Sequence, residues 1–435
     1  MDAKYEFVAN NEHQFIFRTN NTAENFKLIS IDITNLQDPK SWKDLVPEND
    51  KDILKWALAA HDNYMVLCYT RDVKNVLQLY EITSGQMIHE FKLDIGMVGK
   101  DSCYCDRKSS HLVFLFKSPL ITGINYHCDL SKPSFDLEIL NEAKVKNFDR
   151  EKFTVEQIFY SSKDGTKIPM FIIHKKDLKK DGNNFTYMFA VGDLGCSIFP
   201  YFTTSTTAII SNFDGVYAMP SIRGGGAYGE KWHKAGMMEK KQNSFDDFIA
   251  AAEYLIEAKY TNSKLLAIEG GGANGGLLAG ACLTQRPDLF GAVYVDEGTL
   301  DMLRFDKFTQ QKVLVDEYGS PTDPNFFPLL RSYSPLHNIK IPEGCDKQYP
   351  AIMLYATGLC DPDAPLHLLK FVATLQYEAK KHPNQKNPFI LSMKTDTDDT
   401  SKSNKQDDHM FDDIIDMMSF FIINLGIKFQ SYVCQ

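Results

Sequence analysis

Short runs in the first third of the chain alternate hydrophobic and polar residues, and Asn-, Asp- and Ser-rich turns separate them. Alternation with a period of two places every second side chain on one face, which predicts half-buried β-strands. The predicted strands cover residues 5–8, 14–18, 26–33, 53–59, 64–69, 76–82, 87–93, 111–116 and 123–128. Sets of strands that recur every ~40–50 residues are typical of propeller blades. The spacing predicts about three blades, fewer than the roughly 4–8 that close a ring.

From about residue 153 the pattern changes, because apolar runs of strand length now alternate with stretches of helical spacing. Within residues 245–257, Phe248, Ala251, Ala252 and Leu255 have the spacing of an amphipathic helix. Further helices are predicted at 277–284, 366–380 and 411–425, strands at 170–173, 208–210, 216–219, 265–268, 351–356 and 388–393, and a polar loop at 394–408. Strands that alternate with helices over ~280 residues indicate an α/β fold with a mainly parallel, doubly wound sheet.

Composition narrows the classes of protein that the chain can belong to. The length of 435 residues predicts two or three domains, and a net charge of −10 without a basic stripe argues against nonspecific nucleic-acid binding. No apolar stretch reaches the ~18–20 residues of a membrane helix, and the polar start of the chain has no signal peptide. Nine cysteines are scattered without a disulfide framework, and Cys103 and Cys105 are too close together for the usual zinc spacing. We therefore expect a cytoplasmic protein with reduced thiols.

The most informative motif is Gly271-Gly272-Ala273-Asn274-Gly275, between the predicted strand 265–268 and the predicted helix 277–284. The pattern G-x-S-x-G places a nucleophilic serine on a sharp strand-to-helix turn, where glycines avoid clashes. Here alanine stands in place of the serine. A phosphate-binding loop is disfavoured, because no Lys-Ser/Thr follows and the G-x-G-x-x-G spacing is missing. The motif indicates either a nucleophile elbow without its nucleophile or a plain structural turn.

Longer runs favour the first interpretation. The chain contains KNVLQL (74–79), SKDGTKIPMF (162–171), IRGGG (222–226), QRPDLFG (285–291), SPLHN (334–338) and PLH (365–367). Together these runs closely resemble the prolyl oligopeptidase family, serine peptidases that join a seven-bladed propeller to an α/β-hydrolase domain built from both ends of the chain. The resemblance implies a partial β-propeller over residues 1–150 and an α/β-hydrolase domain over 151–435. It also implies that the earlier blades and the N-terminal hydrolase segment are absent here.

The resemblance further implies that the catalytic triad is lost. The serine position of the family falls on Ala273, with an extra glycine just upstream. The aspartate position falls on Cys360 and that of a substrate-binding arginine on Pro362, although Asp361 would replace the acid if the loop shifted by one residue. The histidine position falls near Asp399.

Neighbouring positions of the family's site have changed as well. The tyrosine whose hydroxyl helps to bind the oxyanion corresponds to Val191, which has no side-chain donor. The aromatic residues that pack on the substrate proline correspond to Leu194 and Leu314. Asn274, whose backbone N–H would supply the other oxyanion donor, and Tyr318 are retained. The resemblance thus implies a persistent scaffold around a degenerate site.

The chemistry explains why these losses matter together. A serine hydroxyl is a poor nucleophile until a histidine removes its proton, and an acid must orient that histidine. Removing the serine alone costs about 10⁶ in rate, roughly 8 kcal/mol. Alanine cannot attack a carbonyl group, so hydrolysis by this route is not expected.

Polar residues near the end of the chain allow two interpretations each. His409 is either a displaced base or, as we favour, an exposed histidine at a helix start. Cys360 is either a replacement nucleophile or a plain thiol, and the sequence places no histidine to activate it. The acidic residues Asp396, Asp398, Asp399, Asp407 and Asp408 lack the ligand spacing of a calcium loop, which favours a solvated loop. We expect no metal and no cofactor.

Three hypotheses about function follow. The first is a catalytically inactive member of the family that retains binding of short peptides or a protein partner. The second is an active serine-type endopeptidase that cleaves short peptides after proline with a rearranged site, which only Asp361 and the retained glycines favour. The third is an unstable, non-enzymatic remnant, since loss of the family's N-terminal segment would expose apolar surface.

Overall fold

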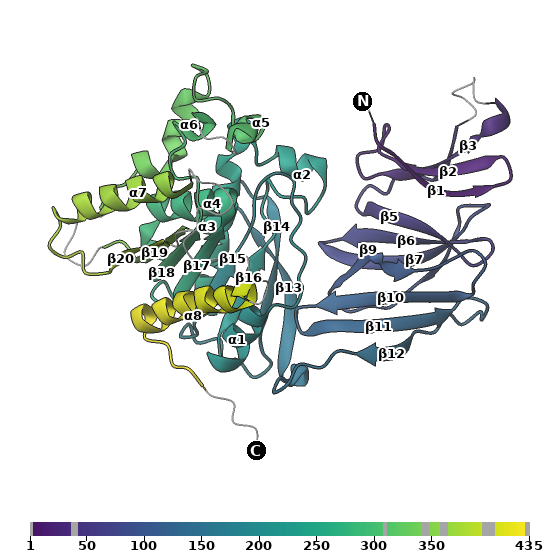
Figure 1. Cartoon of the computed structure of the whole chain (residues 1–435), viewed down its shortest axis with the longest axis horizontal. Coiled ribbons are helices and arrows are strands. Elements are labelled where there is room, and N and C mark those ends of the chain that lie inside the picture. The colour runs from purple at the N-terminus through teal and green to yellow at the C-terminus, as the bar shows by residue number, and fades with distance from the viewer. Residues whose placement is uncertain are drawn as a thin grey trace. The chain divides into compact units, whose positions relative to one another are not determined.

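The computed structural model describes residues 3–35, 42–307, 311–341, 348–356, 364–393 and 405–430 (Figure 1). The chain divides into two compact units. The first comprises Met1–Arg150 with two later segments, Phe199–Thr203 and Tyr228–Glu230, and the second comprises Glu151–Ile198, Thr204–Ala227 and Lys231–Gln435. Within the described ranges, every helix is too short or too polar to cross a membrane.

Three four-stranded antiparallel sheets make up the described part of the first unit. The first sheet contains β1 (Tyr5–Asn11), β2 (Gln14–Thr19), β3 (Lys27–Asp32) and β4 (Lys43–Val46). The second contains β5 (Ile53–Ala60), β6 (Tyr64–Arg71), β7 (Lys74–Glu81) and β8 (Met87–Glu90). The third contains β9 (Met97–Tyr104), β10 (His111–Ser118), β11 (Ile121–Asp129) and β12 (Glu138–Glu142). In each sheet, strands that follow one another in sequence pair with each other.

The burial pattern of β10 shows why these segments form strands. Leu112, Phe114 and Phe116 are buried, whereas His111 and Lys117 are exposed, so the period of two places the apolar side chains on one face. The buried face joins a core that the second sheet also lines. Every strand predicted for this region overlaps an observed strand, and the structure adds β4, β9 and β12.

One eight-stranded sheet forms the centre of the second unit, in the order β13-β14-β16-β15-β17-β18-β19-β20. Its strands are β13 (Phe153–Ser161), β14 (Lys167–Lys175), β15 (Thr186–Phe189), β16 (Val216–Pro220), β17 (Leu266–Gly271), β18 (Ala292–Asp296), β19 (Ala351–Ala356) and β20 (Phe389–Met393). The strands from β16 to β20 pair in parallel, and β13 and β14 pair antiparallel. The strand order reverses at β15, which lies between β16 and β17. In open α/β sheets, ligands bind at the carboxyl ends of the strands beside such a reversal.

Helices cover both faces of this sheet. They are α1 (Thr204–Asn212), α2 (Glu230–Lys234), α3 (Gln242–Glu257), α4 (Gly272–Gln285), α5 (Val315–Tyr318), α6 (Phe327–Tyr333), α7 (Ala364–Ala379) and α8 (Lys405–Leu425). Side chains of α3, α4 and α7 pack with Met188 and Ile268 in the main core. The neighbouring Tyr187 projects to the other face, where its ring meets Phe421 of α8. Figure 1 shows α8, in yellow, lying across the sheet.

Two predictions from the sequence are corrected by the structure. Residues 208–210 were expected to form a strand, but they lie in α1. The β-branched side chains of Ile209 and Ile210 favour a strand locally, yet α1 connects β15 to its parallel neighbour β16, and such a pair needs a crossover that is usually a helix. The predicted loop 394–408 ends earlier, because α8 begins at Lys405, while residues 394–404 lie outside the described residues.

Candidate active site

The bend between β17 and α4 lies at the carboxyl edge of the sheet. Gly271 has φ −96° and ψ 139°, and Gly272 follows in the left-handed region with φ +68°. A Cβ atom on Gly270 would lie 2.2 Å from the carbonyl oxygen of Gly275, so a side chain is excluded there. A Cβ atom on Gly272 would meet no atom of the described residues within 4 Å. The bend therefore has the sharp, open geometry of a nucleophile elbow.

Neither residue at the bend offers a nucleophile. The left-handed backbone falls on Gly272, which has no side chain, and Ala273 follows it in the first turn of α4. A left-handed backbone costs a non-glycine residue roughly 1–2 kcal/mol, a strain that active enzymes accept in order to expose their serine. In this chain a glycine occupies the strained position, so the strain is relieved and no hydroxyl is presented.

The two retained residues of the predicted site lie in contact. The Tyr318 hydroxyl is 2.5 Å from Asn274 Oδ1 and 3.1 Å from Asp193 Oδ2. A phenol has one proton, so Tyr318 donates to one of these two acceptors at a time. Burial raises the pKa of the Asp193 carboxyl. The polar side chains retained at the site therefore satisfy one another.

A buried ion cluster supports this hydrogen-bonded group. Lys241 Nζ donates to the carbonyl oxygen of Gly192 at 2.7 Å and lies 3.8 Å from Glu317 Oε1. The other oxygen of Glu317 lies 2.7 Å from His233 Nε2, and the ammonium group of Lys241 lies 5.1 Å from the ring centre of Tyr318. Burial lowers the pKa of Lys241. The cluster joins four separate segments, so no short motif in the sequence could have revealed it.

Two carboxyl groups with raised pKa values lie at the ends of β17 and β18. Burial raises the pKa of Glu269 to about 8 and that of Asp296 to about 6. Strand register places Gly271 opposite Asp296, and the Tyr187 hydroxyl donates to the Glu269 carboxyl group. At pH 7 Glu269 is therefore mostly protonated. Sequence reasoning missed these acids, although a glutamate at the end of an apolar strand was a usable signal.

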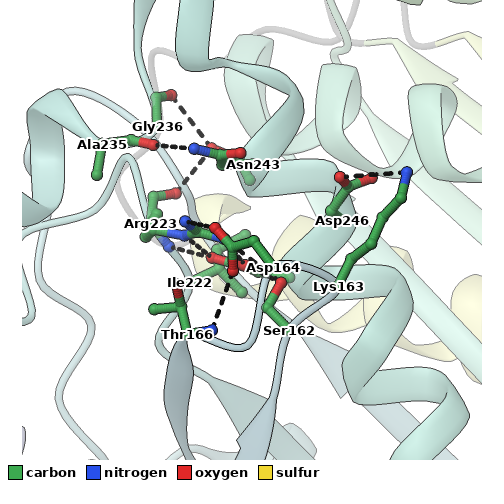
Figure 2. A network of polar contacts seen from close by, with 12 residues as sticks. Ser162, Lys163, Asp164, Thr166, Ile222, Arg223, Ala235, Gly236, Asn243 and Asp246 are labelled. Atoms are coloured by element: carbon green, nitrogen blue, oxygen red, sulfur yellow. Dashed lines mark hydrogen bonds and ion pairs between the residues drawn. The ribbon is translucent and has the colours of Figure 1, made fainter.

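Figure 2 shows a second network, in which Arg223 is held by carboxylates. Its guanidinium group donates to both oxygens of Asp247, at 2.9 and 2.7 Å, and to Asp164 at 2.6 Å. Ser162 Oγ donates to Asp247 Oδ1 at 2.5 Å. Hydrogen bonding to Arg223 lowers the pKa of Asp164. These bonds fix the loop 222–226, one of the segments on which the family resemblance rests.

The predicted substrate-side residues lie in different environments. Val191 is half-buried in the loop that follows β15. Leu194, in the same loop, is 49% exposed and has a left-handed backbone with φ +50°. Leu314 is buried and packs in the main core. Leu194 alone of these three presents a large apolar surface to solvent.

Several predicted positions lie outside the described part of the chain. Cys360, Asp361 and Pro362 follow β19 in sequence, and Asp399 follows β20. The side chains of Ala273 and His409 are likewise not among those described. The assignment of these residues to the family's catalytic positions stays a prediction.

Among the described residues, no group of three or more His, Cys, Asp or Glu side chains could hold a metal ion. A cavity of about 830 Å³ is lined by residues that include Lys264, Gly291 and Pro350, which precede β17, β18 and β19. It therefore lies at the amino ends of these strands, opposite the edge that carries the bend.

Comparisons with known proteins agree on one family. Residues 200–426 match the prolyl oligopeptidase family, and residues 1–137 match the N-terminal β-propeller domain of prolyl oligopeptidase. The chain is 33% identical over 430 residues to prolyl oligopeptidase ophP of Omphalotus olearius, covering 99% of the chain and 56% of that protein. It is 34% identical over 437 residues to the prolyl endopeptidase of Dictyostelium discoideum, covering 98% of the chain and 56% of that protein.

Solved structures agree with these matches. Prolyl oligopeptidase B from Galerina marginata, bound to a 35mer hydrolysis and macrocyclization substrate, superposes with a TM-score of 0.86 at 31% identity. The match covers 98% of this chain and 59% of that chain. The chain thus spans little more than half the length of the relatives that it matches. Its fold is an N-terminal β-propeller domain followed by an α/β-hydrolase domain.

Proposed function

The chain belongs to the prolyl oligopeptidase family, and we propose that it is a non-hydrolytic member that binds short peptides or a protein partner. One observation carries the first half of this proposal. The left-handed position of the elbow is Gly272 and the next residue is Ala273, so neither residue has an oxygen that could attack a carbonyl group.

The loss of the nucleophile is sufficient to stop the family's reaction. Acyl transfer begins when a serine oxygen attacks the scissile carbonyl carbon, and removing that serine costs about 10⁶ in rate. The predicted exchanges at Cys360 and Asp399 would add little to this loss, because a triad acts as a unit. Restoring one member should therefore leave the chain inactive.

The second half of the proposal, binding, is supported by what remains around the bend. The reversal of strand order at β15 gives the sheet a ligand-binding edge. The N-cap of α4 is Gly271, and no side chain of the described residues caps the helix there, so the N–H groups of the first turn are the donors that we assign to a peptide carbonyl group. Leu194 adds an exposed apolar side chain beside this edge. A relative of this fold, prolyl oligopeptidase B, is bound to a 35mer.

The hydrolysis half is tested with a fluorogenic peptide that releases its fluorophore after proline. We expect no turnover by the purified chain above a blank, with an active prolyl endopeptidase as the positive control. Turnover that copurifies with the chain and stays with it through size-exclusion chromatography would contradict the proposal.

The binding half is tested by fluorescence anisotropy with a labelled proline-containing peptide. We expect saturable binding that Leu194→Asp weakens and that the matched change Ile423→Asp, at a 77% exposed position of α8, leaves unchanged. Absence of binding by a chain that unfolds cooperatively would reject a peptide-binding role, and absence of cooperative unfolding would favour the unstable remnant.

A further inference from the structure

Two histidines lie on one face of the third sheet of the first unit, far in sequence from the bend. His111 begins β10, and His127 lies near the end of β11, the next strand of the same meander (Figure 1). The register pairs His111 with Asp129 and Val113 with His127. Directly opposed residues share a face, and so do residues two apart on one strand. Both imidazoles therefore project from the same face.

The rings approach each other through one nitrogen each. His111 Nδ1 lies 2.9 Å from His127 Nε2, with ring centres 5.1 Å apart. A neutral imidazole has one N–H group and one lone pair. One ring therefore donates its N–H group to the lone pair of the other ring, and the donating ring keeps a lone pair on its second nitrogen. His111 is exposed and the His127 side chain is 18% exposed, so solvent and ions reach the pair.

The surroundings of His127 match those of a metal-binding histidine. Its second nitrogen, Nδ1, lies 3.6 Å from Glu138 Oε2 on the neighbouring strand β12, in the direct register position. A carboxylate beside one ring nitrogen orients the ring and favours the N–H on that side, which leaves Nε2 as the ligand atom. Asp129, opposite His111 in the register, is engaged by its own turn, since its Oδ1 accepts hydrogen bonds from the backbone N–H and the hydroxyl of Ser131.

We propose that His111 and His127 form a bidentate site for a divalent transition-metal ion with tetragonal preference, Cu²⁺ or Ni²⁺. Two nitrogens that bind one ion at about 2.0 Å and a cis angle of about 90° lie about 2.9 Å apart, whereas a tetrahedral angle would need roughly 3.3 Å. The present 2.9 Å is the length of the hydrogen bond between the rings, and it shows that the two strands bring two imidazole nitrogens within the span of one ion. On binding, the hydrogen bond between the rings breaks, the ring that donated it takes the tautomer with its one proton on the other nitrogen by exchange with water, and both rings turn until a lone pair of each points at the ion.

Water completes the coordination of the ion. No cluster of three or more His, Cys, Asp or Glu side chains suited to a metal occurs in the part of the chain that the structure describes. The ion therefore bridges two strands rather than filling a cage. Because it binds the folded sheet and cross-links β10 to β11, it should raise the thermal midpoint of unfolding as its concentration rises.

The test uses the full chain without an affinity tag and isothermal titration with CuCl₂ and NiCl₂. His111→Ala and His127→Ala should each weaken the tightest site at least tenfold, since a bidentate site becomes monodentate. His13→Ala, which removes an exposed histidine in the turn between β1 and β2, should leave the affinity unchanged. Glu138→Gln should weaken binding by a smaller factor, because it removes an orienting group and not a ligand.

Electron paramagnetic resonance of the chain with one equivalent of Cu²⁺ gives a readout that does not depend on any variant. Hyperfine structure from two imidazole nitrogens supports the proposal, and a spectrum with one nitrogen or with oxygen ligands alone contradicts it. Equal affinities of the wild-type chain and His127→Ala would also contradict it. The outcome is independent of the proposed function, because the site lies outside the hydrolase domain.

Discussion

The Arg223 network and the Glu269–Asp296 pair lie in the same unit and neutralise buried charge in opposite ways. Arg223 matches its positive charge against Asp247 in a bidentate pair. Glu269 is neutralised by a proton at neutral pH, since burial and the nearby Asp296 raise its pKa to about 8, whereas Asp296, whose pKa is raised to about 6, takes up its proton at lower pH. Ion pairing depends little on pH near neutrality, whereas neutralisation by protons depends on it strongly.

The two groups differ in their place in the unit, since the Arg223 network holds the scaffold and the Glu269–Asp296 pair lies beside the bend. The Arg223 network fixes the loop 222–226 through groups that need no substrate. The carboxyl pair flanks the bend, where a working site would place a nucleophile. A chain that keeps the Arg223 network but has no nucleophile beside the carboxyl pair is expected to fold as the family does. We expect it to bind a peptide or protein partner without hydrolysis.

The largest expected effect comes from breaking the ion network. Arg223→Met should destabilise the chain by about 3–5 kcal/mol, because Asp247 would be left buried and unpaired. Urea denaturation followed by tryptophan fluorescence measures this change. Arg286→Ala is the matched control, since its partners Glu253 and Asp288 are exposed and surface pairs contribute about 0–1 kcal/mol. Equal losses of unfolding free energy in Arg223→Met and Arg286→Ala would contradict the expected difference between the buried and the exposed ion pairs.

The next effect is the pH dependence of stability. The folded chain holds the pKa of Glu269 at about 8, above the ordinary glutamate value of 4.5, so the folded state binds this proton more tightly than the unfolded state. The resulting stabilisation is complete below pH 4.5 and is lost as the pH rises through 8. Asp296, raised from 3.8 to about 6, acts in the same direction at lower pH.

We therefore expect the free energy of unfolding to fall between pH 6 and pH 8, by at most about 1.4 kcal/mol per pH unit for one proton. Glu269→Gln should flatten this slope, whereas Glu257→Gln, at the end of α3, should not change it. Urea denaturation at pH 6, 7 and 8 provides the measurement. A stability that rises over this range would reject the proposed neutralisation by protons.

A smaller effect is expected at the hydrogen-bonded group beside the bend. Tyr318→Phe removes the hydroxyl that contacts Asp193 and Asn274, which should cost about 1–2 kcal/mol. Tyr377→Phe changes a 63% exposed ring and should have no measurable effect. Thermal unfolding of both variants distinguishes a buried network from a loosely held side chain, and equal midpoints would argue for the latter.

The smallest effect is expected from restoring a hydroxyl at the bend. Gly272→Ser places a side chain in open space at the cost of about 1 kcal/mol for the left-handed backbone. No peptidase activity should appear, because a serine without a base is a poor nucleophile. Measurable turnover of the fluorogenic peptide by this variant would show that an acid–base pair persists near the bend.

Local patterns predicted nine of the twelve described strands of the propeller domain and the four longest helices of the second unit, because period and turn residues are read from neighbouring positions. They failed at α1, where the need for a crossover between β15 and β16 outweighs the strand preference of Ile209 and Ile210. Motif spacing located the bend.

The contacts around the bend could not be predicted in the same way. Tyr187 and Glu269 are 82 residues apart, and Arg223 and Asp164 are 59 apart, so only the folded sheet brings each pair together. The extra glycine of the motif likewise needed the folded structure to be placed. The sequence match assigned the serine position to Ala273, whereas the left-handed backbone falls on Gly272.

The most direct test of the central claim is intact-mass spectrometry after incubation with a fluorophosphonate probe, which reacts covalently with activated serines. We expect no adduct on the purified chain under conditions that label an active prolyl endopeptidase completely. A stoichiometric adduct that maps to a serine of the hydrolase domain would contradict it.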